Sequence, residues 1–352
     1  MFESVLICEG AMSRLPHAVS GALAGIVALA TLGSCVGRDP RPVGGSGRIS
    51  ITYLQKQGDQ AYFRDEARGA QARAAELDVD LTVVDVGTDG KKTLDALRAA
   101  VSRGASGVIV ASPDPALGPQ LVRIAHDARV ELLASDDQMC EDLPDPSVCA
   151  HQRLVPRVGF DGAAMGDAVG RRAAQEYRKA GWKAADTRVV AAGRTDLSVC
   201  EDRIDGAKLA FLQSGGQVRT LTIATDNTSE GARRAVASTT VAEPGSPRHW
   251  VVWGCNDENV LGGLSALRAA GVGAANVIGV GLGAYLACRG WEDGDPFAMR
   301  AALSINGKEV GTLAVQAMYD KVKNGRAFPG EVLAPAVMVD AESWRSAGTE
   351  CG

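Results

Sequence analysis

Histidines and phosphate-binding glycine loops are the features that this sequence most clearly lacks. Only four histidines occur among its 352 residues, none beside an obvious serine or cysteine nucleophile and none at a metal-ligand spacing. No Gly-x-Gly-x-x-Gly segment follows the first predicted strand, and no Gly-x-x-x-x-Gly-Lys-Ser/Thr segment is present. A dinucleotide site needs such backbone N–H groups beside its phosphates. These absences argue against an enzyme and predict neither a metal ion nor a cofactor.

Positive charge is not in surplus either. The chain carries 37 lysines and arginines against 42 aspartates and glutamates, for a formal net charge of −5. Nucleic-acid-binding proteins usually carry an excess of cations that neutralise phosphates, so nucleic acid is not an expected partner. With 46% hydrophobic and 22% charged residues the chain is globular, and its length allows two domains of ordinary size.

The N-terminal apolar run, Val19 to Leu32, is too short and too rich in alanine and glycine for a membrane-spanning helix. It follows Arg14 and is typical of a signal peptide, with an ordinary buried or uncleaved segment as the alternative. The run ends in Leu-Gly-Ser-Cys, which predicts a lipoprotein processing site. We therefore expect residues 1–35 to be the signal peptide and Cys35 to carry the lipid.

The segments on either side of this signal have distinct compositions. Residues before Met12 include acidic residues but no basic one, which favours Met12 over Met1 as the true start. Residues 36–47 are rich in glycine, proline and arginine, as in a flexible tether. The mature protein is expected in the periplasm or at the cell surface, as a lipoprotein that meets the membrane only through its anchor.

Exported proteins can form disulfides, and six cysteines lie beyond Cys35. Cys140 and Cys149 bracket the loop Glu-Asp-Leu-Pro-Asp-Pro-Ser-Val, which a disulfide could close. The remaining four are interpreted as a second candidate pair and two small buried hydrophobic residues: Cys288 with Cys351, and Cys200 and Cys255.

From Arg48 onward, short β-branched runs alternate with amphipathic stretches. The runs are continuously apolar, as in strands of a parallel sheet with helices on both faces. The alternation restarts after Cys149, which predicts an α/β fold of two doubly wound parallel-sheet lobes. The expected helices cover residues 60–77, 91–103, 117–129, 162–181, 201–213, 229–238, 258–270 and 308–324. The expected domains are an N-terminal lobe of residues 48–158 plus 303–329 and a C-terminal lobe of residues 159–302 plus 330–352.

Polar and aromatic side chains follow the apolar runs, where doubly wound sheets bind their ligands. Carboxylate, amide and guanidinium groups can pair with adjacent sugar hydroxyls, and aromatic rings can stack on the C–H patches of a sugar. This combination predicts a sugar site. The candidate residues are Lys56, Gln57, Asp59, Gln60, Tyr62, Phe63, Asp136, Asp137, Gln138, Phe160, Asp161, Arg203, Asn256, Asp257 and Glu258.

Structural roles remain open for several of these residues. Asp136 could cap backbone N–H groups, and Asn256 or Asp257 could be the N-cap of the following helix. Arg203 could be a solvated surface cation, and Lys56 could also lie on the surface.

Four segments together carry a family resemblance. They are Lys92 to Leu97 (KTLDAL), Ser112 to Gly118 (SPDPALG), Asp136 to Gln138 (DDQ) and His249 to Leu264 (HWVVWGCNDENVLGGL). In this order and spacing they resemble the type I sugar-binding proteins of ABC importers, in particular the periplasmic arabinose-binding group. The likeness extends from Arg48 to the C-terminal region.

The resemblance implies two lobes joined by three hinge strands that close over a monosaccharide. By position it assigns contacts to five residues and aromatic walls to two, with Asp137 near the anomeric centre and Arg203 at the ring oxygen. The contacts are Lys56, Asp136, Asp137, Arg203 and Asn256, and the walls are Phe63 and Phe160. Gln60, at the position of a family glutamate, is a further expected ligand residue.

The sequence also departs from that family pattern. A glutamate of the first loop is replaced by Gln60, a threonine contact by Val199, and two polar contacts by Gly283 and Leu286. Each lost partner would leave a ligand hydroxyl unpaired at about 1–3 kcal/mol. The resemblance therefore implies a sugar without identifying it as L-arabinose. Asp59, Asp161 and Tyr285 could compensate, or the ligand could be larger or less hydroxylated on that side.

The leading hypothesis is a monomeric, non-catalytic lipoprotein that delivers a monosaccharide to an ABC permease and its ATPase subunits. The alternative is a sugar sensor whose closed form docks a chemoreceptor or sensor kinase. A glycosidase is disfavoured because Asp136 and Asp137 come from one backbone segment and cannot flank a bond from opposite sides. A sugar-responsive repressor would need a helix-turn-helix where the signal sequence stands.

Overall fold

The computed structural model describes residues 48–140, 155–241, 243, 245 and 247–352. These residues belong to one compact unit, Val43–Gly352. The expected signal peptide, lipid-bearing Cys35, the tether and Cys149 lie outside the described residues, so the expectations about them stay predictions.

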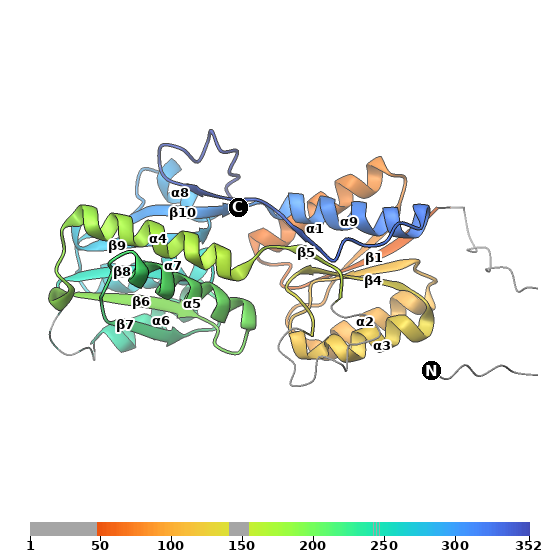
Figure 1. The fold of residues 1–352 in the computed structure, drawn as a ribbon, viewed down its shortest axis with the longest axis horizontal. Coiled ribbons are helices and arrows are strands. Elements are labelled where there is room, and N and C mark those ends of the chain that lie inside the picture. The colour runs from red at the N-terminus through yellow and green to blue at the C-terminus, as the bar shows by residue number, and fades with distance from the viewer. Residues whose placement is uncertain (1–47, 141–154, 242, 244, 246) are drawn as a thin grey trace, which may run out of the picture. The chain divides into compact units, whose positions relative to one another are not determined.

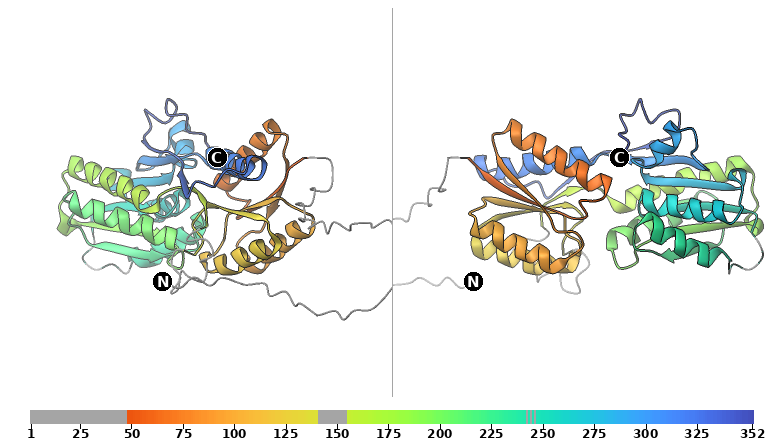
Figure 2. Two further views of the ribbon diagram at one scale, coloured as in Figure 1. Left: turned by 45° about the vertical axis from the view of Figure 1, so that its right-hand side comes forward. Right: turned by 180° about the vertical axis from the view of Figure 1, so that it is seen from behind.

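The first half of the fold is a six-stranded parallel sheet in the order β11-β5-β4-β3-β1-β2. Its strands are β1 (Ser50–Gln55), β2 (Asp80–Asp85), β3 (Gly107–Val110), β4 (Glu131–Asp136), β5 (Arg157–Gly159) and β11 (Glu331–Leu333). Its helices are α1 (Ala61–Glu76), α2 (Gly90–Ser102), α3 (Gly118–Ala128) and α9 (Gly307–Asn324), with a 3-10 turn at Pro115–Leu117. Helices α1 and α9 lie side by side on one face, and α2 and α3 cover the other (Figures 1 and 2).

The second half repeats this topology in the order β12-β10-β9-β8-β6-β7, with only the edge strand β12 antiparallel to its neighbour. Its strands are β6 (Thr187–Gly193), β7 (Thr220–Ala224), β8 (His249–Gly254), β9 (Val277–Gly283), β10 (Met299–Ile305) and β12 (Ala336–Val339). Its helices are α4 (Gly162–Ala180), α5 (Ser198–Gln213), α6 (Ser229–Val241), α7 (Asp257–Ala269) and α8 (Ala287–Glu292), with 3-10 turns at Ala184–Asp186 and Ala274–Asn276. The predicted fold class, two doubly wound parallel sheets, is confirmed.

The apolar strands are explained by helices on both faces of each sheet. In β3, Val108 and Val110 pack with α2 and α3, whereas Ile109 packs with α1 and α9. All three side chains are fully buried. Burial of each such side chain stabilises the fold by about 1.5–3 kcal/mol, so both faces of the strand must be apolar.

The chain passes between the two sheets three times, after β5, after β10 and after β11. Strand β11 pairs with β5, so the last passage comes after Leu333, whereas the expected lobe boundary stands at residue 330.

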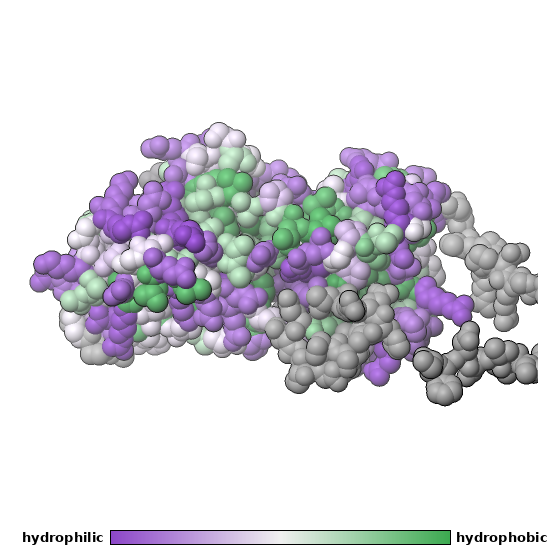
Figure 3. Space-filling view, in the orientation of Figure 1, coloured by the Kyte–Doolittle hydropathy of each residue, from purple (hydrophilic) through white to green (hydrophobic). Residues whose placement is uncertain are grey.

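Large hydrophobic side chains are exposed at only a few described positions, and hydrophilic residues separate the hydrophobic groups on the face in Figure 3. Those positions are Leu209, Leu212, Val241, Leu333 and Val337.

Disulfides correct part of the cysteine interpretation. Cys288 and Cys351 form a disulfide, as predicted. Cys200 and Cys255 also form one, so their interpretation as simple hydrophobic residues was wrong. Cys140 is disulfide-bonded as well. Its predicted pairing with Cys149 stays a prediction, because Cys149 lies outside the described residues.

Candidate functional site

One pocket is lined by residues that follow strands of both sheets. Of the eight residues expected from the family resemblance to contact or wall the ligand, it brings together seven: Lys56, Gln60, Phe63, Asp136, Asp137, Arg203 and Asn256. Lys56 directly follows β1, Asp136 ends β4, and Asn256 follows β8 by two residues. These strands end at the same edge of their sheets, where doubly wound folds bind ligands.

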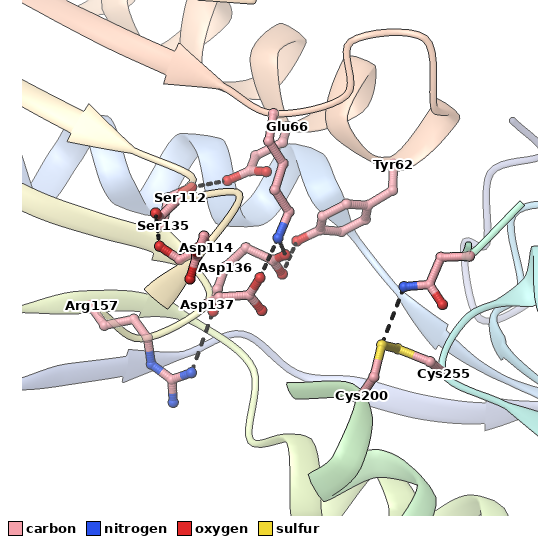
Figure 4. A network of polar contacts seen from close by, with 12 residues as sticks. Tyr62, Glu66, Ser112, Asp114, Ser135, Asp136, Asp137, Arg157, Cys200 and Cys255 are labelled. Atoms are coloured by element: carbon pink, nitrogen blue, oxygen red, sulfur yellow. Dashed lines mark hydrogen bonds and ion pairs between the residues drawn. A yellow bond between two sulfur atoms is a disulfide. The ribbon is translucent and has the colours of Figure 1, made fainter. Parts of the chain in front are cut away.

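A buried ion cluster forms the wall that belongs to the first sheet (Figure 4). The Lys56 ammonium contacts the Asp137 carboxylate and lies 3.7 Å from Asp136 Oδ2. All three residues are at most 7% exposed. Burial alone would lower the pKa of Lys56, but the charges of Asp137 and Asp136 outweigh it and raise that pKa. Lys56 is therefore a permanent cation that holds two carboxylates together at this wall of the pocket.

The Asp136 backbone is held in an unusual conformation. Its φ of 64° lies in the left-handed region, which is uncommon for a residue other than glycine. The Arg157 guanidinium donates to the Asp136 carbonyl over 3.3 Å. Gly159 passes so close that a Cβ there would lie 2.2 Å from the same carbonyl oxygen. Strand β5 thus fixes the direction from which the two carboxylates enter the pocket.

A second layer of polar groups lies behind Asp136. The Tyr62 hydroxyl donates to Asp136 Oδ1 over 3.2 Å. Deeper still, the Ser135 hydroxyl donates to Glu66, and Tyr53 Oη lies 3.1 Å from Ser135 Oγ. Burial, helped by the nearby charge of Asp136, raises the pKa of Glu66 to about 8. Glu66 is therefore neutral at pH 7, which spares the site a third buried negative charge.

Aromatic rings complete this wall. The Lys56 ammonium lies 5.3 Å from the centre of the Phe63 ring, within the range of a cation–π interaction. Gln55 Nε2 donates to the Phe63 carbonyl over 2.7 Å and so fixes the first turn of α1. Tyr62 packs edge-on against Phe63 with ring centres 5.0 Å apart. Two rings with restricted motion therefore stand beside the charged groups.

The opposite wall is built on α5 and the end of β8. Arg203 projects from α5, and its Nη1 donates to the Cys255 carbonyl over 3.1 Å. The Cys200–Cys255 disulfide joins the first turn of that helix to the residue before Asn256. Both half-cystines line the pocket and are at most 2% exposed. A covalent link thus holds the elements that carry Arg203 and Asn256.

Asn256 is the N-cap of α7, and Asp257 is not. Asn256 Oδ1 accepts hydrogen bonds from the backbone N–H and the side-chain amide of Asn259, the former over 3.0 Å. Its Nδ2 donates to the Asn227 carbonyl over 3.1 Å. Asp257 is instead fully buried and accepts from the N–H groups of Leu286 and Ala287 over 3.0 and 3.1 Å.

Two buried polar atoms of the pocket residues have no partner among the residues that the structure describes. They are Asp137 Oδ1, an acceptor from the first half of the fold, and Arg203 Nε, a donor from the second. An unsatisfied buried polar group costs about 1–3 kcal/mol, so native proteins rarely retain one without a reason. A ligand that donates to one and accepts from the other would remove both costs.

Some candidate residues from the sequence lie outside the pocket lining, and some lining residues were not candidates. Phe160 is buried outside the pocket lining, where its ring lies 6.4 Å from that of Tyr62. Asp161 caps α4 by accepting from Ala164 N–H over 2.9 Å and is absent from the pocket lining. Asp59 is exposed and likewise absent from the lining. The lining also includes Gln57 and Tyr62, which are candidates from the sequence, and Val199 and Tyr285, which the comparison with the family pattern names. The sequence did not single out the other lining residues: Leu197, Asn227, Leu282, Ile305 and the Cys200–Cys255 disulfide.

The pocket side chains are suited to binding a ligand through hydrogen bonds and ring contacts. The positive charges of Lys56 and Arg203 offset the negative charges of Asp136 and Asp137, so the pocket offers no surplus charge for an ionic ligand.

Within the described ranges, no group of three or more His, Cys, Asp or Glu residues could hold a metal ion. No helix among the described residues between 48 and 352 is long and apolar enough to cross a membrane.

Comparison with known proteins agrees with this geometry. The model of periplasmic binding proteins and the sugar binding domain of the LacI family matches residues 48–342. The chain is 27% identical to the ABC transporter L-arabinose-binding periplasmic protein of Azospirillum brasilense over 308 residues, 86% of this chain and 90% of that protein. It is 29% identical to the L-arabinose-binding periplasmic protein of Escherichia coli over 236 residues, 66% of this chain and 70% of that protein.

A solved structure extends the likeness to the fold. The myo-inositol binding protein of Caulobacter, bound to myo-inositol, superposes with a TM-score of 0.72 at 23% identity. The match covers 88% of this chain and 98% of that one. With the family model spanning both sheets, the chain belongs to the family of periplasmic binding proteins and sugar-binding domains of the LacI type.

Proposed function

We propose that this protein is the sugar-binding component of an ABC importer, which binds one monosaccharide in the pocket between Lys56 and Arg203. The observation that carries the proposal is the pair of unpaired buried atoms, Asp137 Oδ1 and Arg203 Nε, on opposite walls of one pocket. A sugar hydroxyl can donate to the carboxylate, while a ring oxygen or second hydroxyl accepts from the guanidinium.

A neutral polyhydroxylated ligand suits the charges of the pocket better than an ion does. Lys56 is already paired with two carboxylates, so an anionic ligand would meet their repulsion. Asp136 and Asp137 accept hydrogen bonds from hydroxyl groups, and the rings of Tyr62 and Phe63 can stack on C–H patches. No catalytic role is assigned to any of these residues.

Transport is favoured over sensing by the relatives. The similar proteins of Azospirillum brasilense and Escherichia coli are both described as L-arabinose-binding periplasmic proteins, the first of an ABC transporter. The corresponding partners here are an ABC permease and its ATPase subunits. The protein acts as a monomer in this scheme and is exported to the periplasm or cell surface.

The binding experiment is titration calorimetry with a panel of pentoses and hexoses. We expect saturable one-to-one binding by at least one sugar, and a loss of affinity of at least tenfold in Arg203→Met. Arg171→Met is the matched control, because Arg171 lies on α4 of the same half, where it forms an exposed pair with Asp167. Absence of binding by every sugar, or equal affinity in both variants, would contradict the proposal.

Membrane attachment through Cys35 is the remaining part of the proposed function. The predicted signal peptide ends at this residue, and the glycine-rich segment 36–47 would tether the folded part. Intact-mass analysis of protein extracted from the membrane fraction should show a lipid on Cys35. Cys35→Ser should move the protein from the membrane to the soluble fraction. An unlipidated N-terminus in the native protein would exclude the anchor without affecting sugar binding.

A further inference from the structure

We propose that the pocket is specific for a 6-deoxyhexose, a sugar whose carbon 6 is a methyl group. The inference rests on the proposed function, because it names the class of monosaccharide that the same pocket prefers. It follows from an unequal distribution of free hydrogen-bond acceptors, and of apolar side chains, between the two walls.

The wall of the first half is rich in groups that pair with hydroxyls. Asp137 retains a buried acceptor that has no partner in the described part of the chain. Gln60 lines the pocket at the N-cap position of α1, yet its side chain makes no capping hydrogen bond. The carboxylates and the Gln60 amide can therefore engage a ligand edge that carries several hydroxyls.

The wall of the second half has polar residues, but the amide oxygens of its two asparagines are occupied by hydrogen bonds within the protein. Both lone pairs of Asn256 Oδ1 are occupied by Asn259, and one Nδ2 hydrogen is occupied by the Asn227 carbonyl. Asn227 Oδ1 accepts from Asn259 Nδ2 and from the Arg194 N–H.

The Tyr285 hydroxyl of this wall is also bonded within the protein, because it donates to Glu258 Oε2 over 2.8 Å. What remains on this side is mainly a set of donors: Arg203 Nε and Nη2, and one hydrogen each of Asn256 Nδ2 and Asn227 Nδ2. These donors serve a ring oxygen or hydroxyl oxygens of the ligand. Among the described lining residues of this wall there is no carboxylate, and the Tyr285 oxygen is the acceptor that is left.

The rest of that wall is aliphatic or sulfur. Leu197, Val199, Leu282, Ile305 and the Cys200–Cys255 disulfide all line the pocket. The flat C–H faces of a sugar ring already have aromatic partners in Tyr62 and Phe63. The aliphatic surface is therefore available for a group of the ligand that has no hydroxyl, and a methyl group fits that chemistry.

The alternative substituents on carbon 5 would be less favourable there. A hydroxymethyl group would bury a hydroxyl against apolar atoms, and such an unpaired group costs about a tenfold loss of affinity or more. A hydrogen atom in place of the methyl group would leave the apolar surface unfilled and lose the gain of burying one carbon, a several-fold effect.

The test is calorimetry with matched trios of sugars that differ only at carbon 5. Each trio holds a pentose, a 6-deoxyhexose and a hexose of one ring configuration, such as L-arabinose, D-fucose and D-galactose, or L-lyxose, L-rhamnose and L-mannose. In the trio that binds, we expect the 6-deoxyhexose to bind at least tenfold more tightly than the hexose and several-fold more tightly than the pentose.

Other outcomes separate this inference from the function on which it rests. If the hexose or the pentose binds as tightly as the 6-deoxyhexose, the inference is overturned while sugar binding stands. If no member of any trio binds, the proposed function is overturned together with it.

A pair of isosteric substitutions tests the aliphatic wall itself. Val199→Thr places a hydroxyl in the pocket lining, and we expect the preference for the 6-deoxyhexose over the hexose to fall at least threefold. Val241→Thr is the matched control, because Val241 is 85% exposed on α6 of the same half. An unchanged preference in Val199→Thr, or an equal change in the control, would contradict the role of this wall.

Discussion

The Cys200–Cys255 disulfide is predicted to set ligand affinity as well as stability. It ties the first turn of α5 to the end of β8, and Arg203 donates to the Cys255 carbonyl. Replacing both cysteines by alanine would free two segments whose relative position determines how Arg203 and Asn256 face the ligand. Ordering them again on binding would cost affinity, and we expect a loss of about tenfold, or about 1.4 kcal/mol.

The chain contains a matched control for this experiment. Cys288 and Cys351 form a second disulfide in the same half, with neither cysteine in the pocket lining. The sequence separations are 55 and 63 residues, so loop-closure entropy predicts nearly equal stabilisation, about 4 kcal/mol for each bond. The two double-alanine variants should therefore lose similar stability on urea unfolding.

Only the Cys200→Ala, Cys255→Ala variant should lose affinity in calorimetry at a temperature where both variants are folded. Equal losses of affinity in the two variants would show that binding follows general stability. Full affinity without the Cys200–Cys255 bond would refute its role in positioning Arg203.

Three further changes test the opposite wall and its support. Asp137→Asn removes a carboxylate that pairs with the buried Lys56 and that can accept from the ligand, so the binding free energy should weaken by about 1.5–3 kcal/mol. A change in calorimetry no larger than that of an exposed Asp→Asn variant would contradict this. The pKa of Glu66 is about 8 in the fold and 4.5 for the free group. The contribution of this shift to the free energy of unfolding is therefore fully present below pH 4.5 and is lost as the pH rises through 8. In Glu66→Gln the free energy of unfolding should therefore fall less between pH 5 and 9 than in the parent, and parallel pH curves would exclude a neutral Glu66. Gly159→Ala brings a Cβ against the Asp136 carbonyl, so denaturant unfolding should show a loss of about 1–3 kcal/mol, and an unchanged midpoint would mean that β5 can move aside.

The fold was predictable because its signals are local. The continuous apolar run of β3 reflects helices on both faces of the sheet, and β-α alternation repeated over both halves predicts two doubly wound sheets. The polar residues after β1, β4 and β8 could be collected from sequence because parallel strands end at one edge. Lys56, Asp137, Arg203 and Asn256 accordingly meet in one pocket.

The features that sequence could not supply depend on contacts between distant segments. Cys200 and Cys255 lie 55 residues apart on different elements, and no spacing rule pairs them. Phe160 follows β5 as the other candidates follow their strands, yet it packs against Tyr62 instead of entering the pocket. Glu66 carries no signal in a helix rich in charged residues, although it is fully buried behind Asp136.

The hydrogen bonds between Asn256 and Asn259 could likewise not be predicted from the sequence. They matter for the site because they occupy the side-chain oxygen of Asn256. Both residues belong to one segment, but the sequence does not show which polar atoms are already bonded. The unequal walls of the pocket became evident only from the hydrogen bonds of Asn227, Asn256 and Tyr285.

The most direct test of the central claim is a crystal structure of the protein with the sugar that binds most tightly. The account predicts one sugar ring in the pocket, with a hydroxyl donating to Asp137 Oδ1 and an oxygen accepting from Arg203 Nε. A sugar bound elsewhere, or held by one wall while the other atom stays unpaired, would contradict it.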